Sequence, residues 1–85
     1  MTKLLKLLDT ICRGDSDQNV SFVELGHLLE RLGFQRRVRG SHHIFWMKGV
    51  EEIINLQSLS GKAKPYQVKQ VRNLILKYKM GDADV

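Results

Sequence analysis

The residues best suited to chemistry are two adjacent histidines, His42 and His43, which follow a Gly40-Ser41 pair typical of a tight turn. Imidazole accepts or releases a proton near neutral pH, so each histidine is a candidate general acid or base. In the strand predicted to begin at His42, consecutive side chains point to opposite faces, so the two rings cannot readily hold one metal ion. Cys12 and His27 lie elsewhere without the spacing of a metal site, and we expect no metal and no cofactor.

One face of this predicted strand carries Phe45 and is the more uniformly apolar, so it is expected to meet the core and to bring His43 inward. His42 then lies on the opposite face, beside the turn, with Arg37 and Arg39 arriving from the preceding strand. The residues alone leave two interpretations of His42 open: a proton-transfer group or an ordinary exposed histidine.

Basic residues are concentrated in the second half of the chain. Residues 1–34 contain four basic and five acidic side chains, residues 35–80 contain ten basic and two acidic ones, and the formal net charge is +5. This distribution is typical of a surface that binds a polyanion, although a solvated basic surface gives the same count. Glu51 and Glu52 show no acid–base spacing, and we expect them to be strand charges that face solvent.

Three other side chains are candidates for nucleic-acid contact. Trp46 lies on the same strand face as His42. It either packs at an interface or offers a ring on which an unstacked base lies. Lys62 and Lys64 precede the last predicted helix, where ammonium groups and free N–H groups at the helix start meet phosphates. A solvated charge pair is an equally good interpretation of these two lysines.

Length and composition predict one domain over residues 1–85. Cys12 is the single cysteine, so it forms no internal disulfide and is expected to be a small core residue in a reducing compartment. Lys6 and Asp9 interrupt the leucine-rich start, so neither a signal peptide nor a membrane span is predicted, and we expect the chain in the cytoplasm.

Apolar residues at helical spacing predict helices over residues 4–12, from Phe22 to a stop at Gly33, and from Pro65 to about residue 78. Ser21 and Glu24 have the spacing of a capping box, which starts the second helix at Phe22. Strands are predicted over residues 34–39, 42–47 and about 51–57, with a loop over 58–64. The order helix, helix, three strands, helix predicts an α+β domain whose three-stranded antiparallel sheet has helices on one face and is open on the other.

The first helix has two possible docking positions. Across the open face it would cover His42, whereas in the helical layer it would only enlarge the core. We expect the second arrangement.

The Leu32-Gly33-Phe34 run, followed by Gly40-Ser41-His42-His43 with Phe45 and then by a third strand and a basic helix, resembles the HicA family of bacterial toxin endoribonucleases. The resemblance covers roughly residues 22–80. It implies a fold like that of a double-stranded-RNA-binding domain, metal-independent cleavage of mRNA within a type II toxin–antitoxin system, and neutralisation by a HicB antitoxin. By position it makes His42 the catalytic histidine, while Gly40 and Ser41 shape the turn and Phe45 anchors the core.

The chain departs from the family pattern in two places, the N-terminal extension over residues 1–20 and the segment 57–67, which lacks the family's usual histidine- and proline-containing run. Both departures bear on how RNA would reach the site and on how an antitoxin would contact the chain. An alternative from another class is a noncatalytic RNA-binding module of similar fold, and a third is an interaction protein whose basic face meets an acidic partner. The expected RNA contacts are Arg37, Arg39, Ser41, Trp46, Lys62 and Lys64.

Overall fold

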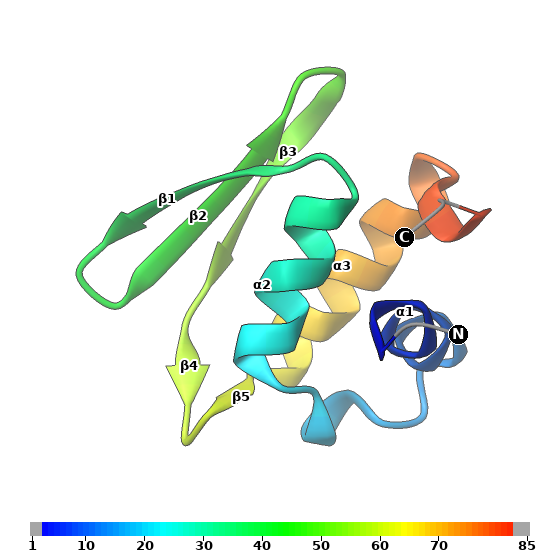
Figure 1. Ribbon diagram of the computed structural model, residues 1–85, viewed down its shortest axis with the longest axis horizontal. Helices are drawn as coiled ribbons and strands as arrows, with labels where there is room; N and C mark the ends of the chain where they lie inside the picture. Colours follow the sequence, from blue (N-terminus) through cyan, green and yellow to red (C-terminus); the bar gives the residue numbers. More distant parts are fainter. Residues whose placement is uncertain (1–2, 83–85) are drawn as a thin grey trace.

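The structure, a computed structural model, describes residues 3–82, in which helices cover one face of a three-stranded antiparallel sheet (Figure 1). The α+β class, the order of the three helices and the three sheet strands, and the antiparallel pairing are as predicted. The elements are α1 (Lys3–Arg13), the 3-10 turn η1 (Asp17–Asn19), α2 (Phe22–Arg31), β1 (Gln35–Arg39), β2 (His42–Met47), β3 (Val50–Leu56), β4 (Ser58–Leu59), β5 (Lys62–Ala63), α3 (Pro65–Lys77) and the 3-10 turn η2 (Met80–Asp82).

Helix α2 begins as its capping residue predicts. The Glu24 N–H donates to Oγ of Ser21 at 3.3 Å, and helical residues start at Phe22. The Glu24 carboxylate has a different role from the one expected of a capping box, because its Oε1 lies 3.2 Å from Nζ of Lys3 in α1. Gly33, with φ of +112°, follows the end of the helix and lets the chain turn into β1.

The sheet has the strand order β1-β2-β3, and its register decides which side chains meet. Arg39 of β1 lies opposite His42 at the start of β2, and Asn55 of β3 lies opposite Ile44. The turn that fixes the first pairing contains Gly40 at φ of +60°, a conformation that glycine adopts without strain. The register shifts between Phe45 and Met47, beyond the region that carries the histidines.

Helix α1 packs against α2 and α3 on the side away from the sheet (Figure 1). Leu8 and Ile11 of α1 are 2% and 0% exposed and belong to one apolar core with the inner face of the sheet. The prediction that α1 extends the helical layer is therefore confirmed. No element within residues 3–82 covers the opposite face of the sheet, which we call the open face (Figure 1).

Two further expectations were wrong. Residues 58–64 are not a plain loop, because β4 and β5 form a short hairpin that holds the start of α2: the Ala63 N–H donates to the Val20 carbonyl at 2.9 Å, and the Phe22 N–H donates to the Gly61 carbonyl at 3.0 Å. Two-residue strands are too short to show alternation in the sequence. Glu52 does not face solvent freely, because the end of α3 reaches β3 and brings Tyr78 to its carboxylate.

No helix among residues 3–82 combines the length and the apolar composition that a membrane crossing requires.

Candidate active site

The two histidines lie on opposite faces of β2, as strand alternation predicts. His42 is exposed on the open face, whereas His43 is half-buried under α2, where its ring meets Phe22 edge-on with centroids 4.9 Å apart. Phe45, on the same face as His43, is fully buried in the core. Only His42 is therefore placed to reach a substrate on the open face.

Two side chains of the third strand region hold the His42 ring. Its Nδ1 lies 3.1 Å from Oδ1 of Asn55, and its Nε2 lies 3.4 Å from the amide nitrogen of Gln57. An amide oxygen can only accept a hydrogen bond, and an amide NH₂ group can only donate one. Both contacts are satisfied when Nδ1 carries the proton and Nε2 carries the lone pair. The arrangement therefore presents Nε2 as the proton acceptor.

Gln57 joins three of the predicted residues into one cluster. Its Nε2 donates to Oγ of Ser41 at 3.2 Å and contacts His42, while its Oε1 accepts from Nζ of Lys64 at 3.4 Å. Ser41, His42 and Lys64 come from a turn, a strand and the start of a helix. The glutamine side chain thus brings an ammonium group close to the histidine.

The buried Gln67 fixes the relative position of Lys64 and Asn55. Its side chain is 1% exposed, its Oε1 accepts from the Lys64 N–H at 3.2 Å, and its Nε2 donates to the Asn55 carbonyl at 3.3 Å. The first of these bonds pairs the N–H of the N-cap residue of α3, while the Gln67 N–H donates to the Lys64 carbonyl at 2.9 Å. Through Gln67, the last helix and the third strand hold the cluster around His42 together.

Asn55, Gln57 and Gln67 were missed by the sequence analysis. Asn55 and Gln57 are polar residues two positions apart in the third strand, so alternation puts both on one face, and a tight turn after β2 puts that face beside His42. That signal was present in the sequence. Nothing local marks Gln67, because its role depends on where α3 docks.

The arginines of β1 divide between the two faces. Arg37 and Arg39 are exposed on the open face and form no ion pair within the described chain, and Arg39 is the direct cross-strand neighbour of His42. Arg36 points the other way and lies 3.1 Å from the Glu30 carboxylate, with its side chain only 20% exposed. The open face therefore keeps two unneutralised guanidinium groups beside the histidine.

Two other cations of the basic half are neutralised elsewhere. Arg72 donates two hydrogen bonds to Asp17, at 2.8 and 3.1 Å, and Lys77 lies 2.6 Å from Glu52. The Asp17 hydrogen bonds raise the pKa of Arg72 further above its ordinary value. Together with Arg36, these residues stabilise the fold, so the count of basic residues overstates the surface available to a polyanion.

Arg36 also supports the position of His43. Its Nη1 lies 3.4 Å from Nδ1 of His43, and its guanidinium lies over the Phe45 ring, 4.8 Å from the centroid. Gly26 of α2 makes this packing possible, because a Cβ atom there would lie 2.4 Å from Nη2 of Arg36. His43 is therefore part of the packing between helix and sheet.

Two predicted contacts lie outside the cluster. Lys62 reaches away from it, with Nζ 3.1 Å from Oδ1 of Asn19. Trp46 stands four residues along β2, about 13 Å from His42 at roughly 3.3 Å per strand residue. It lines a shallow depression of about 260 Å³ on the open face together with Arg37, Arg39, Ile44 and Ile53.

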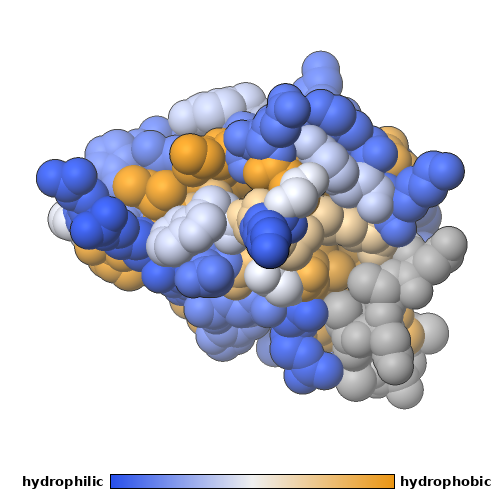
Figure 2. Space-filling model, turned by 90° about the horizontal axis from the view of Figure 1, so that it is seen from above, coloured by the Kyte–Doolittle hydropathy of each residue, from blue (hydrophilic) through white to orange (hydrophobic). Residues whose placement is uncertain are grey.

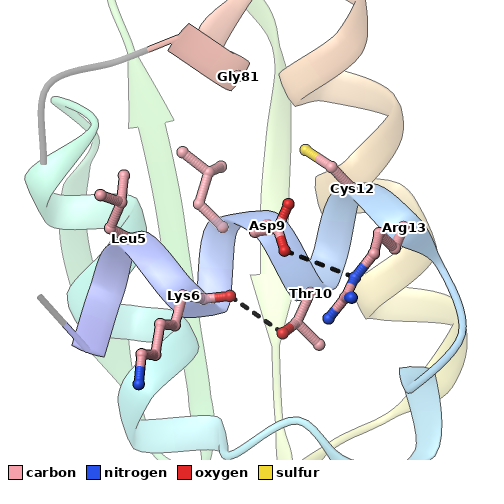
Figure 3. A pocket seen from close by; sticks show the side chains of 8 residues that line it. Leu5, Lys6, Asp9, Thr10, Cys12, Arg13 and Gly81 are labelled. Carbon is pink, nitrogen blue, oxygen red and sulfur yellow. Dashed lines mark hydrogen bonds and ion pairs between the residues drawn. The ribbon is translucent and has the colours of Figure 1, made fainter. Parts of the chain in front are cut away.

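A larger hollow of about 460 Å³ lies along α1 and reaches Gly81 (Figure 3). Asp9 and Arg13, one turn apart on α1, pair at 3.5 Å, and Thr10 donates to the Lys6 carbonyl at 3.0 Å (Figure 3). Burial, followed by the nearby Asp9 charge, raises the pKa of the Cys12 thiol, which keeps it protonated and a poor nucleophile. We therefore place the chemistry on the open face, although this hollow is larger.

Comparison with known proteins gives no relative for this chain: no family model, no curated protein and no solved structure matches it. Within residues 3–82, no three His, Cys, Asp or Glu side chains gather as a metal site would require. The functional conclusion therefore depends on the geometry around His42 and on the resemblance in residues 22–80.

Proposed function

We propose that this chain is a metal-independent endoribonuclease that uses His42 as its single catalytic histidine. The observation that carries the proposal is the exposed imidazole whose Nδ1 is held by Asn55, so that Nε2 is the acceptor. Beside it lies the guanidinium of Arg39, which has no ion-pair partner among residues 3–82. The resemblance in residues 22–80 adds the biological setting: a toxin of a type II toxin–antitoxin system that cleaves mRNA in the cytoplasm and is neutralised by a HicB-like antitoxin.

The proposed reaction begins when the RNA 2'-hydroxyl replaces Gln57 at Nε2 of His42. The hydroxyl oxygen attacks the adjacent phosphorus while its proton passes to Nε2, and the imidazolium then returns a proton to the departing 5'-oxygen. One P–O bond forms and one breaks, so the products are a cyclic phosphate and a free 5'-hydroxyl. Arg39 and Lys64 stabilise the negative charge that develops on the phosphoryl oxygens.

Two histidine variants test this proposal. His42→Ala should lower RNA cleavage in the presence of a chelator by about 10²- to 10⁴-fold, the usual contribution of positioned proton transfer, and should abolish growth arrest on induction. His27→Ala removes an exposed histidine from α2 and should behave like the wild type. Equal cleavage by the wild type and His42→Ala would contradict the assignment of His42 as the catalytic histidine.

The basic open face also supports a second candidate, a noncatalytic RNA-binding module that holds phosphates through Arg37 and Arg39. Retained RNA binding without cleavage, in the wild type and in His42→Ala alike, would favour this candidate. A protein that only meets an acidic partner would lack the steep salt dependence of RNA affinity that phosphate contacts produce.

The proposed partner has its own test. A small reading frame for a HicB-like protein should lie beside the one for this chain, and its product should co-purify with this protein and suppress cleavage. A stable complex that leaves cleavage unchanged would contradict the antitoxin assignment.

A further inference from the structure

We infer that the depression around Trp46 is a nucleobase subsite, and that RNA bound on the open face is single-stranded there. This inference rests on the proposed binding of RNA, but it does not require cleavage.

The depression is apolar on a face that otherwise carries polar and charged groups. Ile53 is 61% exposed, and Ile44 and Trp46 beside it are half-buried. In the space-filling view, apolar atoms lie among hydrophilic side chains at the left, the side of the molecule that contains the sheet (Figure 2). The helices lie on the other face of the sheet, so no element of the described chain covers these side chains (Figure 1).

Charge indicates what kind of ligand fits. Arg37 and Arg39 line the depression, and neither has a carboxylate partner within the described chain. The acidic residue that alternation places on the same face, Glu51, lies at the Trp46 end of β3, where Val50 pairs with Met47, but it does not line the depression. An aromatic ring bordered by free guanidinium groups suits a flat, anionic ligand, in which a base stacks on the ring and the flanking phosphates meet the arginines.

The position of Trp46 limits the form of the RNA. A base inside a duplex is stacked on both sides and paired at its edge, so only an unpaired base can lie on the indole face. The separation of about 13 Å from His42 along β2 equals about four nucleotides at 3.4 Å each, and fewer in an extended strand. The stacked base is therefore within about four nucleotides of the bond that His42 would cleave.

Trp46 is the single tryptophan of the chain, so its fluorescence reports on this subsite alone. The probe is a single-stranded 2'-O-methyl RNA of about 12 nucleotides, within the usual site size of such surfaces, which lacks the attacking hydroxyl. The same strand in a duplex serves as the comparison, and labelled-probe anisotropy measures affinity independently. We expect the single strand to quench Trp46 and the duplex to leave its emission unchanged.

Variants of Trp46 test whether stacking on its ring contributes to the affinity for RNA. Trp46→Ala should weaken single-strand binding by about 5- to 150-fold, the range associated with loss of one stacked base, while Trp46→Phe keeps a ring and should stay within about threefold. Leu76→Ala removes another exposed apolar side chain, from α3, and should change nothing. If Trp46→Ala fails to fold, quenching of the wild type decides the question.

The outcomes distinguish this inference from the proposed function. Quenching by the single strand supports the subsite even if unmodified RNA is not cleaved. The subsite is overturned if RNA is cleaved while Trp46 stays unquenched and Trp46→Ala keeps full affinity. That result would leave the proposed nuclease activity unaffected. Absence of any RNA binding at low salt overturns both.

Discussion

Gln67 donates a hydrogen bond from its buried side chain to the backbone carbonyl of Asn55, 3.3 Å away. The side-chain oxygen of Asn55 lies in turn 3.1 Å from Nδ1 of His42. A residue inside the core thus connects the last helix to the ring that we propose as catalytic. This connection predicts that core and site respond together when Gln67 is changed.

Gln67→Met should lower the free energy of unfolding by about 1–3 kcal/mol, because it leaves the Asn55 carbonyl and the Lys64 N–H without their buried partners. Urea denaturation measures this loss, and the rate of RNA cleavage should fall with it. Gln70→Met, one turn along α3, removes a side chain that has no hydrogen-bond partner within the described chain, and should be nearly neutral. Equal stability of the two variants would contradict the role of Gln67.

Asn55→Ala removes the acceptor that orients His42. The maximal cleavage rate should fall by about 2- to 12-fold, the equivalent of one ordinary hydrogen bond, while the affinity for RNA stays unchanged. Asn55→Asp keeps an acceptor at this position and should recover most of the rate. A weaker affinity with an unchanged rate would show that Asn55 binds RNA instead of positioning the histidine.

Replacing both Arg37 and Arg39 by alanine should make RNA binding less dependent on salt. Each phosphate contact to a single strand contributes about 0.7 to the slope of log affinity against log salt, so two lost contacts reduce its steepness by about 1.4. Lys69→Ala, an exposed cation on α3, is the matched control and should leave the slope as it is. The same reduction in both variants would mean that RNA is held by the overall charge of the protein.

The hydrogen bonds of Glu52 predict that the fold loses stability at acidic pH. Hydrogen bonds from Lys77, and then from Tyr78, lower its pKa from 4.5 to about 2. Because the folded pKa lies below the ordinary one, the stabilisation is complete above about pH 4.5 and is lost as the pH falls toward 2. Thermal unfolding midpoints of the wild type should therefore fall more steeply across this window than those of Glu52→Gln. Parallel curves would show that the interaction contributes nothing to stability.

Helix α1 should matter for stability and not for catalysis. Ile11 is fully buried between the helices, so Ile11→Ala should cost about 2–5 kcal/mol of unfolding free energy. Cleavage by the protein that remains folded should be unchanged, because α1 lies on the side away from the open face (Figure 1). A loss of activity at full stability would show instead that α1 takes part in the site.

Much of the fold was predictable because the relevant signals are local. Helical spacing, the Ser21 cap and the Gly40-Ser41 turn determine the elements, since each depends on residues only a few positions apart. The same holds for the separation of His42 from His43, because alternation in a strand leaves no other arrangement. The hairpin over residues 58–63 escaped prediction because its pairing is too short to leave a pattern.

The sequence by itself determined the three helices and the three strands of the sheet, the faces of β2, and the choice of His42 over His43 as the exposed candidate. Only the tertiary structure decided which partners surround that histidine and which cations stay free. Gln67 acts on Asn55 across twelve positions, and Asp17 neutralises Arg72 across fifty-five. The physical reason is that such contacts depend on how the helices dock on the sheet, and docking is set by the burial of the whole apolar core.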